Sequence, residues 1–246
     1  MVRLVSILPA LLFILLPAEA RAQRAASVSH PDGEWQFARF VYQGAGYRGS
    51  AFRTDWPEAE VHLRQGLDRL TRIKTGDDLW IYPDGEEIMN YPWLYAVEVG
   101  RWYLDDRDAA LLREYLLRGG FLLVDDFWGS RQWAVFEDSI RRVFPNRPIV
   151  ELDESDTLMD MIYDLDKSVQ IPGRGYINSG ITSQQDGYTP HWRGIYDEDG
   201  RLMVAINFNM DLGDAWEHAD DPRYPEPFTG LAYRFAVNYV IYAMTH

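Results

Sequence analysis

The sequence contains no cysteine among its 246 residues. Disulfide bonds, thiolate metal ligands and a cysteine nucleophile are therefore excluded, and the hydrophobic core must hold the fold together. The length allows one substantial core. Basic residues are also scarce, because 24 Lys and Arg stand against 38 Asp and Glu, for a formal charge of −14. Such a chain would be repelled by a nucleic-acid backbone or an anionic bilayer, but not by a neutral or cationic ligand.

No apolar run reaches the roughly 20 residues that a membrane-spanning helix needs. The nearly apolar segment Leu4–Leu16 follows a short basic start and precedes two cleavage motifs, Ala18-Glu19-Ala20 and Ala20-Arg21-Ala22. This pattern is typical of a signal peptide, so we predict that residues 1–22 are removed and that the protein is periplasmic or secreted. We expect no stable membrane insertion after cleavage; an uncleaved anchor is the alternative. Residues 23–34 are predicted to be a disordered lead-in.

Strand-like and helix-like patterns alternate along residues 35–246, which predicts a single α/β domain. The clearest unit is a strand at Trp93–Val97, a helix capped near Asp105 and a buried strand at Phe121–Val124. A unit of this length places its two strands parallel in one sheet, with a right-handed crossover. Later in the chain, Asp197–Gly200 (DEDG) predicts the turn of a β-hairpin.

Two further residues have predicted structural roles. Asp55 begins the sequence Asp-Trp-Pro-Glu, which is typical of a helix start with the aspartate as N-cap and the proline in the first turn. That helix is expected to run to about Lys74. Asn238 lies in the middle of an apolar helix predicted at 229–244, so we expect a buried amide that is hydrogen-bonded to a neighbouring loop.

Four segments resemble the bacterial family DUF4159, whose function is unknown. They are Gly119–Gly129 (GGFLLVDDFWG), Asp199–Val204 (DGRLMV), Asn238–Ala243 (NYVIYA) and the aspartate-rich Asp211–Trp216. The resemblance implies a flavodoxin-like, class I glutamine amidotransferase-like three-layer sandwich with a mostly parallel sheet. It implies no established activity. The amidotransferase reaction itself is excluded, because that reaction needs a cysteine nucleophile.

Acidic residues follow both strands of the predicted parallel unit. Glu98 comes directly after the first strand, and Asp125 and Asp126 come after the second. Neighbouring strands lie roughly 4.8 Å apart, so paired strands would bring these carboxylates to one edge of the sheet. Close carboxylates raise each other's pKa or recruit a cation, which suits acid/base chemistry. The alternative is that the aspartates cap the helix that begins near Arg131, or pair with that arginine.

A second group of polar and aromatic residues is predicted to bind a ligand. Tryptophans beside loops or helix starts and near carboxylates suit carbohydrate or a protein partner, although ordinary core packing is the alternative. Asp214 and His218 have a helical spacing that can hold a divalent ion, but no second histidine lies nearby, so we predict neither a metal nor a cofactor. The predicted ligand-binding residues are Trp128, His191, Trp192, Asp211, Asp214 and Trp216.

The sequence favours an exported, non-catalytic module of the cell envelope. It would bind a small neutral or cationic ligand, or an envelope protein, through an acidic and aromatic crevice. The alternative is a carboxylate-dependent hydrolase acting on carbohydrate, with Asp125, Asp126 and Glu98 as its acid and base. Binding is favoured because the sequence shows no catalytic constellation with the required spacing.

Overall fold

Five parallel strands form the centre of the main sheet. The computed structural model describes residues 33–44 and 51–246, and within them the sheet has seven strands. The parallel strands pair in the order β3-β1-β4-β6-β9, which, renumbered along the chain, is the 2-1-3-4-5 order of flavodoxin-like folds. The predicted fold is therefore confirmed. These strands are β1 (Ala38–Phe40), β3 (Leu79–Ile81), β4 (Trp93–Val97), β6 (Phe121–Phe127) and β9 (Leu202–Phe208).

Two antiparallel strands extend the sheet beyond β9. The first, β8 (His191–Tyr196), joins β9 through the turn predicted at Asp197–Gly200, and β7 (Val150–Glu151) pairs with β8. A separate two-stranded ribbon joins β2 (Gln43–Gly44) to β5 (Trp102–Tyr103). The predicted parallel pairing of β4 and β6 is confirmed, so the two strands end at the same edge of the sheet.

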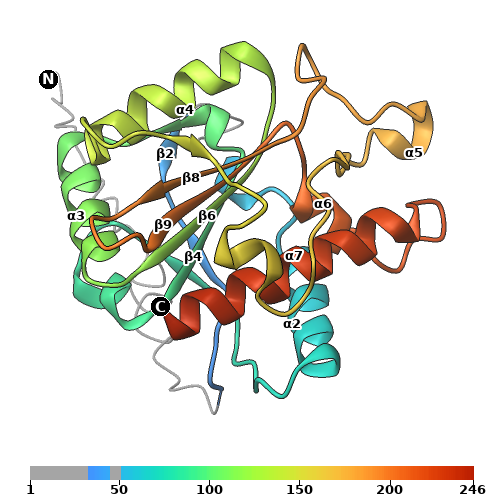
Figure 1. Ribbon diagram of the computed structural model, residues 1–246, viewed down its shortest axis with the longest axis horizontal. Coiled ribbons are helices and arrows are strands. Elements are labelled where there is room, and N and C mark those ends of the chain that lie inside the picture. Colours follow the sequence, from blue (N-terminus) through green and yellow to red (C-terminus); the bar gives the residue numbers. More distant parts are fainter. Residues whose placement is uncertain (1–32, 45–50) are drawn as a thin grey trace, which may run out of the picture. The chain divides into compact units, whose positions relative to one another are not determined.

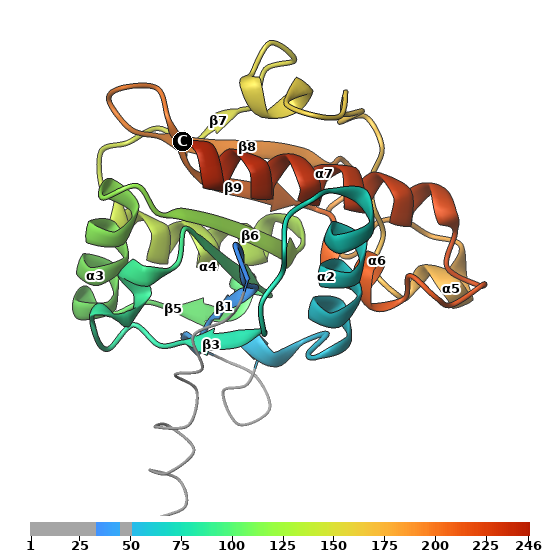
Figure 2. The same cartoon turned by 90° about the horizontal axis from the view of Figure 1, so that it is seen from below.

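Helices cover both faces of the sheet and make three layers (Figures 1 and 2). On one face lie α3 (Asp106–Leu117) and α4 (Gly129–Val143), and on the other lie α2 (Glu58–Leu70), α6 (Leu212–Glu217) and α7 (Glu226–Thr245). The short helices are η2 (Ala51–Arg53), η3 (Glu86–Asn90), η4 (Val99–Arg101), η5 (Thr157–Asp160) and α5 (Tyr176–Ser179).

Alternate residues of the central strands pack into opposite layers. In β6, Leu122 and Val124 join the core beneath α3 and α4, whereas Phe121 and Leu123 join the core beneath α2, α6 and α7. Every residue of β6 is buried, as expected for a parallel strand that is covered on both faces. The polar residues at the end of this strand are therefore also enclosed by protein.

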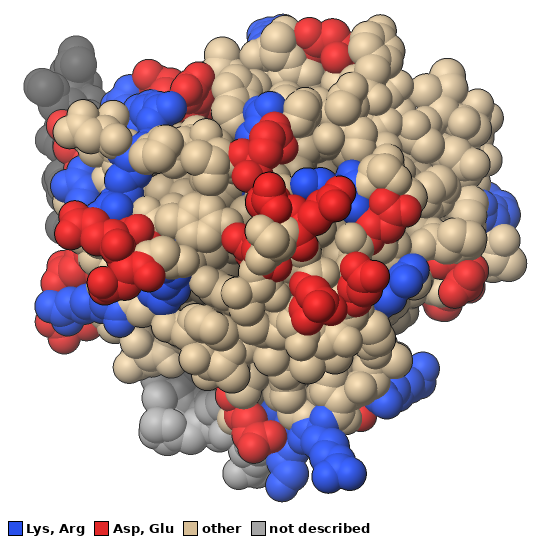
Figure 3. All heavy atoms as spheres, viewed as in Figure 1, with Lys and Arg blue, Asp and Glu red and all other residues tan. Residues whose placement is uncertain are grey.

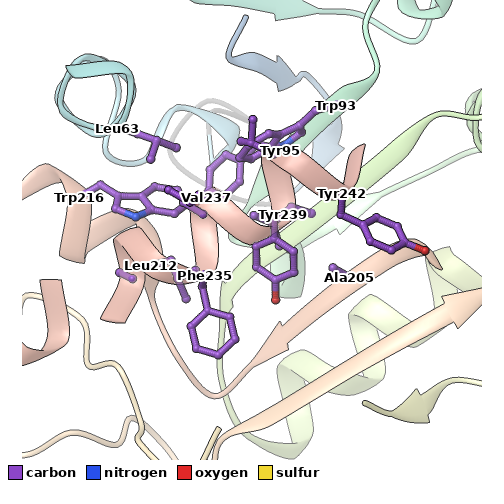
Figure 4. Close-up of a cluster of buried hydrophobic side chains, with 14 of the residues drawn as sticks. Leu63, Trp93, Tyr95, Ala205, Leu212, Trp216, Phe235, Val237, Tyr239 and Tyr242 are labelled. Atoms are coloured by element: carbon purple, nitrogen blue, oxygen red, sulfur yellow. The ribbon is translucent and has the colours of Figure 1, made fainter. Parts of the chain in front are cut away.

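Aromatic rings fill the core on the α7 side of the sheet (Figure 4). The ring of Trp216 in α6 lies against Tyr95 of β4, with centroids 5.7 Å apart. Phe235 of α7 stacks on Trp192 of β8 at 3.7 Å. Burial of each such ring contributes roughly 1.5–3 kcal/mol. Both tryptophans thus serve core packing.

Two boundaries differ from the predictions in ways that matter for the site. The strand β6 continues through Phe127, so Asp125 and Asp126 lie within the strand and not after it. The predicted N-cap role of Asp55 is wrong, because α2 begins at Glu58 with Pro57 as its N-cap and ends at Leu70. The backbone of Asp55 has a φ of 65°, and its side chain turns toward other carboxylates.

Asn238 has the buried role that the sequence predicts. Its side-chain oxygen accepts hydrogen bonds from the backbone N–H groups of Ile162 (3.2 Å) and Tyr163 (3.0 Å). Its amide nitrogen donates to the carbonyls of Leu158 (2.7 Å) and Tyr163 (2.8 Å). One amide in α7 thereby satisfies the backbone of the segment that follows η5.

The predicted signal peptide and most of the predicted lead-in lie outside the described residues, which belong to one compact unit. Within the part of the chain that the structure describes, no helix combines the length and apolar character needed to cross a membrane.

Replacement of Asn238 by leucine is expected to destabilise the protein by at least about 2 kcal/mol. Buried N–H and C=O groups in the segment after η5 would lose their partners, at roughly 1–3 kcal/mol each. Urea unfolding measures the change. Arg234→Leu, an exposed substitution in the same helix, should alter the free energy of unfolding by no more than about 0.5 kcal/mol. Equal stability of the two variants would contradict the assignment.

Candidate acidic site

Carboxylates from four parts of the chain gather beyond the carboxyl ends of the parallel strands. The order of the sheet reverses between β1 and β4, which is where open α/β sheets bind their ligands. Each of these carboxylates perturbs, or is perturbed by, another member of the group. We name this group the acidic cluster: Asp55, Glu98, Asp125, Asp126, Asp211, Asp214 and Glu217.

Asp125 fastens the start of α6 to the sheet. Its side chain is fully buried, and its Oδ2 accepts hydrogen bonds from the backbone N–H groups of Leu212 (2.8 Å) and Gly213 (3.0 Å) and from the Tyr95 hydroxyl (3.2 Å). Its Oδ1 has no hydrogen-bond partner among the described residues. Burial and the charge of Asp126 raise the pKa of Asp125 to about 8, against the lowering effect of these hydrogen bonds.

Asp126 faces the remaining members of the cluster. Its backbone φ is 51°, which turns the end of β6, and its Oδ1 accepts a hydrogen bond from the indole N–H of Trp128 at 2.8 Å. The carboxyl group of Asp211 shares a further hydrogen bond with it. Burial and the charge of Asp214 raise the pKa of Asp126 to about 6. The pKa of Asp211 is raised well above its ordinary value by burial and by Asp126, so Asp211 holds the shared proton.

The sequence Asp-Leu-Gly-Asp after β9 holds two carboxylates rigidly. Asp211 is the N-cap of α6, and its Oδ1 accepts a hydrogen bond from the backbone N–H of Asp214 at 2.7 Å. The Oδ2 of Asp214 accepts a hydrogen bond from the backbone N–H of Arg174 at 2.5 Å. The segment around Arg174 belongs to the long connection before β8, so that connection covers one side of the cluster.

Asp55 is positioned by the buried cation of β1. Arg39 pairs with Glu60 of α2, and its Nη1 donates to the carbonyls of Phe52 (3.0 Å) and Thr54 (2.6 Å), directly before Asp55. The Oδ2 of Asp55 is buried and has no hydrogen-bond partner among the described residues. Burial and the charge of Asp214 raise the pKa of Asp55 well above its ordinary value, although Arg39 opposes this change.

Glu98 lies at the same edge of the sheet, but its electrostatic partner differs from the predicted one. Its pKa is raised to about 8 by burial first and by Asp126 second. Asp125, the predicted partner, does not contribute to this rise; its side chain faces α6 instead. Glu98 also forms an ion pair with Arg101 at 3.0 Å.

At the far end of α6, His218 faces two acids of the cluster. Its Nε2 lies 3.3 Å from Glu217 and 3.7 Å from Asp214, with no hydrogen-bond geometry to either. Burial raises the pKa of Glu217, and the charge of His218 opposes this rise. The basic groups acting on the cluster are thus Arg39 and Arg101, each already paired with a glutamate, and this histidine.

Left-handed backbone accumulates around the cluster. The φ angles are 54° at Glu98 and 63° at Asn209, which follow β4 and β9, in addition to those of Asp55 and Asp126. Such conformations cost of order 1–3 kcal/mol each for non-glycine residues and persist at functional sites. Strain at the ends of three neighbouring strands supports a functional role for this edge.

The predicted aromatic residues lie in the core. Trp128, Trp192 and Trp216 are at most 2% exposed, so none offers a ring face to solvent, and Trp192 lies in β8 instead of the predicted loop. Trp128 and Trp216 nevertheless lie beside the acidic cluster. The sheet pairing with β9 continues two residues further than the sequence predicts, which places Trp192 against α7.

His191 is separated from the acidic cluster. Its Nδ1 lies 2.8 Å from a carboxylate oxygen of Glu151, and the residue lines a cavity of about 330 Å³ together with Ser130, Trp133 and Tyr188. None of the residues of the acidic cluster lines this cavity. The structure therefore brings together Glu98, both aspartates of β6 and both aspartates of α6, and places His191 elsewhere.

Asp55 and Glu217 are the members of the cluster that the sequence predictions missed. The residues around Asp55 match a helix start so well that a local interpretation absorbed its charge. Only the order of the strands indicates that the segment after β1 reaches the ends of β4 and β6.

A family model described as "Domain of unknown function (DUF4159)" matches residues 36–244. The match confirms the resemblance seen in the sequence and spans the sheet and the whole acidic cluster. No curated protein matches the chain significantly. The placement among class I glutamine amidotransferase-like folds stays a prediction.

Asp125→Ala is expected to lower the free energy of unfolding by at least about 2 kcal/mol. The variant leaves two buried backbone N–H groups at the start of α6 without an acceptor, at roughly 1–3 kcal/mol each. Asp125→Asn retains one oxygen acceptor and loses the buried charge, so it should stay within about 1 kcal/mol of the wild type. Urea unfolding compares the variants, and equal losses would show that Asp125 does not hold α6.

In buffer containing EDTA, stability is expected to fall between pH 5 and pH 8. The raised pKa values of Glu98 and Asp125, both about 8, mean that these acids ionise first in the unfolded state as the pH rises. A tenfold change in the ionisation constant of an acid corresponds to about 1.4 kcal/mol, and a loss of at least about 1 kcal/mol should lower Tm by roughly 2–4 °C. A Tm that is constant or rises over this range would contradict the raised pKa values of these two acids.

Proposed function

We propose that this chain, which belongs to the DUF4159 family, is an exported, non-catalytic binding module that holds a positively charged group of its ligand in the acidic cluster. The observation that carries the proposal is the convergence of carboxylates at the topological switch point of the sheet. They outnumber the basic groups that act on them. A bound cation would supply the missing positive charge.

A structural role alone does not account for the cluster. Asp125 serves the fold, because it binds the start of α6, but Asp55 and Asp126 hold buried charge on strained backbone. Buried like charges repel each other strongly at low dielectric constant. Strained backbone and strongly perturbed pKa values are features that proteins retain mainly where they bind or react.

The charge of the whole chain supports a cationic ligand. The formal charge is −14, and Figure 3 shows acidic side chains across the middle of one face of the molecule. A negative surface raises the local concentration of cations and speeds their association. Residues 1–22 support placement in the periplasm or outside the cell, where the ligand would be a cation or an envelope component with a basic group.

A carbohydrate hydrolase is the second candidate function. One observation favours it: Glu98 and Asp126 act on each other and differ in pKa, about 8 against about 6, which is the pattern of a proton donor beside a proton acceptor. The buried tryptophans weaken it, because they offer no platform for a sugar ring. Hydrolysis of chromogenic glycosides by the wild type, lost in Asp126→Asn, would favour this candidate over binding.

Isothermal titration of the full chain with a panel of cations tests the proposal. The panel contains Ca²⁺, Mg²⁺, Mn²⁺, a diamine and an arginine-containing dipeptide. We expect at least one to bind, and its affinity should fall at least about tenfold in Asp126→Asn, which removes one charge. That variant should also have a higher Tm than the wild type, because asparagine tolerates positive φ and can still accept the bond from Trp128.

Asp138→Asn is the matched control, because Asp138 is exposed on α4 and pairs only at the surface with Arg142. It should leave both cation affinity and Tm unchanged. Failure of every cation to bind, or unaltered binding in Asp126→Asn, would overturn the proposed function.

A further inference from the structure

We infer that the positively charged group is a hard divalent metal ion, bound by Asp55, Asp211 and Asp214. The inference rests on the proposed function and narrows it to one ligand class and three named carboxylates. These residues come from the segment after β1 and from the first turn of α6, so the site bridges the two sides of the topological switch point.

The spacing of the three carboxylates suits a single ion. One oxygen from each residue lies within 4.8 Å of the oxygens of the other two. Oxygens bound to one Ca²⁺ at 2.3–2.6 Å can be at most roughly 4.6–5.2 Å apart, whereas Mg²⁺ at about 2.1 Å would need a small contraction. All three donors are carboxylate oxygens, which favour Ca²⁺, Mg²⁺ or Mn²⁺ over softer metals.

Unpartnered buried oxygens are the second, independent observation. The Oδ2 of Asp55 is buried without a hydrogen-bond partner among the described residues, and so is one oxygen of the fully buried Asp125 beneath the site. Buried carboxylate oxygens in folded proteins are normally hydrogen-bonded or bound to a metal. Asp55 directs its free oxygen at the first turn of α6, close to the oxygens of Asp211 and Asp214.

Two glycines allow the backbone to approach these oxygens closely. A Cβ on Gly213 would lie 2.3 Å from the Oδ2 of Asp55, and a Cβ on Gly173 would lie 2.9 Å from Asp211 and 3.1 Å from Asp214. The three carboxylates are therefore enclosed from two sides. Their backbone hydrogen bonds hold Asp211 and Asp214 in place without the ion, which is the arrangement of a preorganised site.

Asp214 also belongs to a second group, with Glu217 and His218, whose ligand atoms lie equally close together. That group is less enclosed, and its free nitrogen already faces two carboxylates, so the histidine can be satisfied by protonation. The two groups differ in their remaining residues. Substitutions at Asp55 and at His218 therefore separate the alternatives.

Terbium luminescence provides a direct test on the full chain. Tb³⁺ is a Ca²⁺ analogue whose emission is excited by nearby indoles, and Trp128 and Trp216 both lie beside the site. After removal of metal with EDTA, we expect saturable emission that Ca²⁺ or Mn²⁺ displaces. Asp55→Asn should lower the affinity by about 100-fold while preserving the fold, since asparagine accepts the φ of 65°.

His218→Gln is the matched control and should retain wild-type affinity. Loss of emission in His218→Gln with retention in Asp55→Asn would overturn the inference in favour of the other group. Absence of saturable Tb³⁺ and Ca²⁺ binding would also overturn it. In that case, binding of the diamine or the dipeptide would leave the proposed function intact, whereas failure of all cations would overturn both.

Discussion

The hydrogen bonds from α6 to Asp125 are the interaction on which the site depends. A short helix has little stability of its own, and this one is held by a fully buried carboxylate that accepts two of its first backbone N–H groups. By fixing the start of α6, Asp125 also fixes Asp211 and Asp214. A residue at the end of β6 thus sets the position of carboxylates far along the chain.

The same bonds explain why negative charge accumulates here. Backbone N–H groups at a helix start lower the energy of one carboxylate, but two oxygens cannot both use the same donors. Asp126, next in the chain, must then meet the acids of α6 without such donors, and its proton is shared with Asp211 instead. Attraction of one acid to α6 brings several others together, and a cation is the ligand that relieves their repulsion.

Local signals made much of the fold predictable. The β4–α3–β6 unit follows from apolar runs, from the N-cap Asp105 and from the positive φ of Gly119, all of which act within a few residues. Asn238 was predictable for the same reason, since one amide in an apolar helix must find partners. The carboxylates after the two strands could also be placed at one edge from parallel pairing alone.

Predictions failed where the partners are distant in sequence. Asp125 bonds to residues 87 and 88 positions later, so no local pattern distinguishes an anchor for α6 from a catalytic acid. The tryptophans were misplaced for a related reason, because pairing between β8 and β9 decides where Trp192 lies. Asp55 was misread because its neighbours carry the sequence of a helix start, while Arg39 determines its actual position.

The left-handed turns at Glu98, Asp126 and Asn209 restrict how this edge of the sheet can diverge in evolution. Branched side chains would clash with their own backbone at such φ values, whatever their charge. Asparagine, aspartate and glycine are the residues best suited to these conformations. A lineage that no longer needed the acidic cluster could lose its charge through asparagine or glycine far more readily than through valine or isoleucine. The path of the main chain would therefore outlast the chemistry of the side chains.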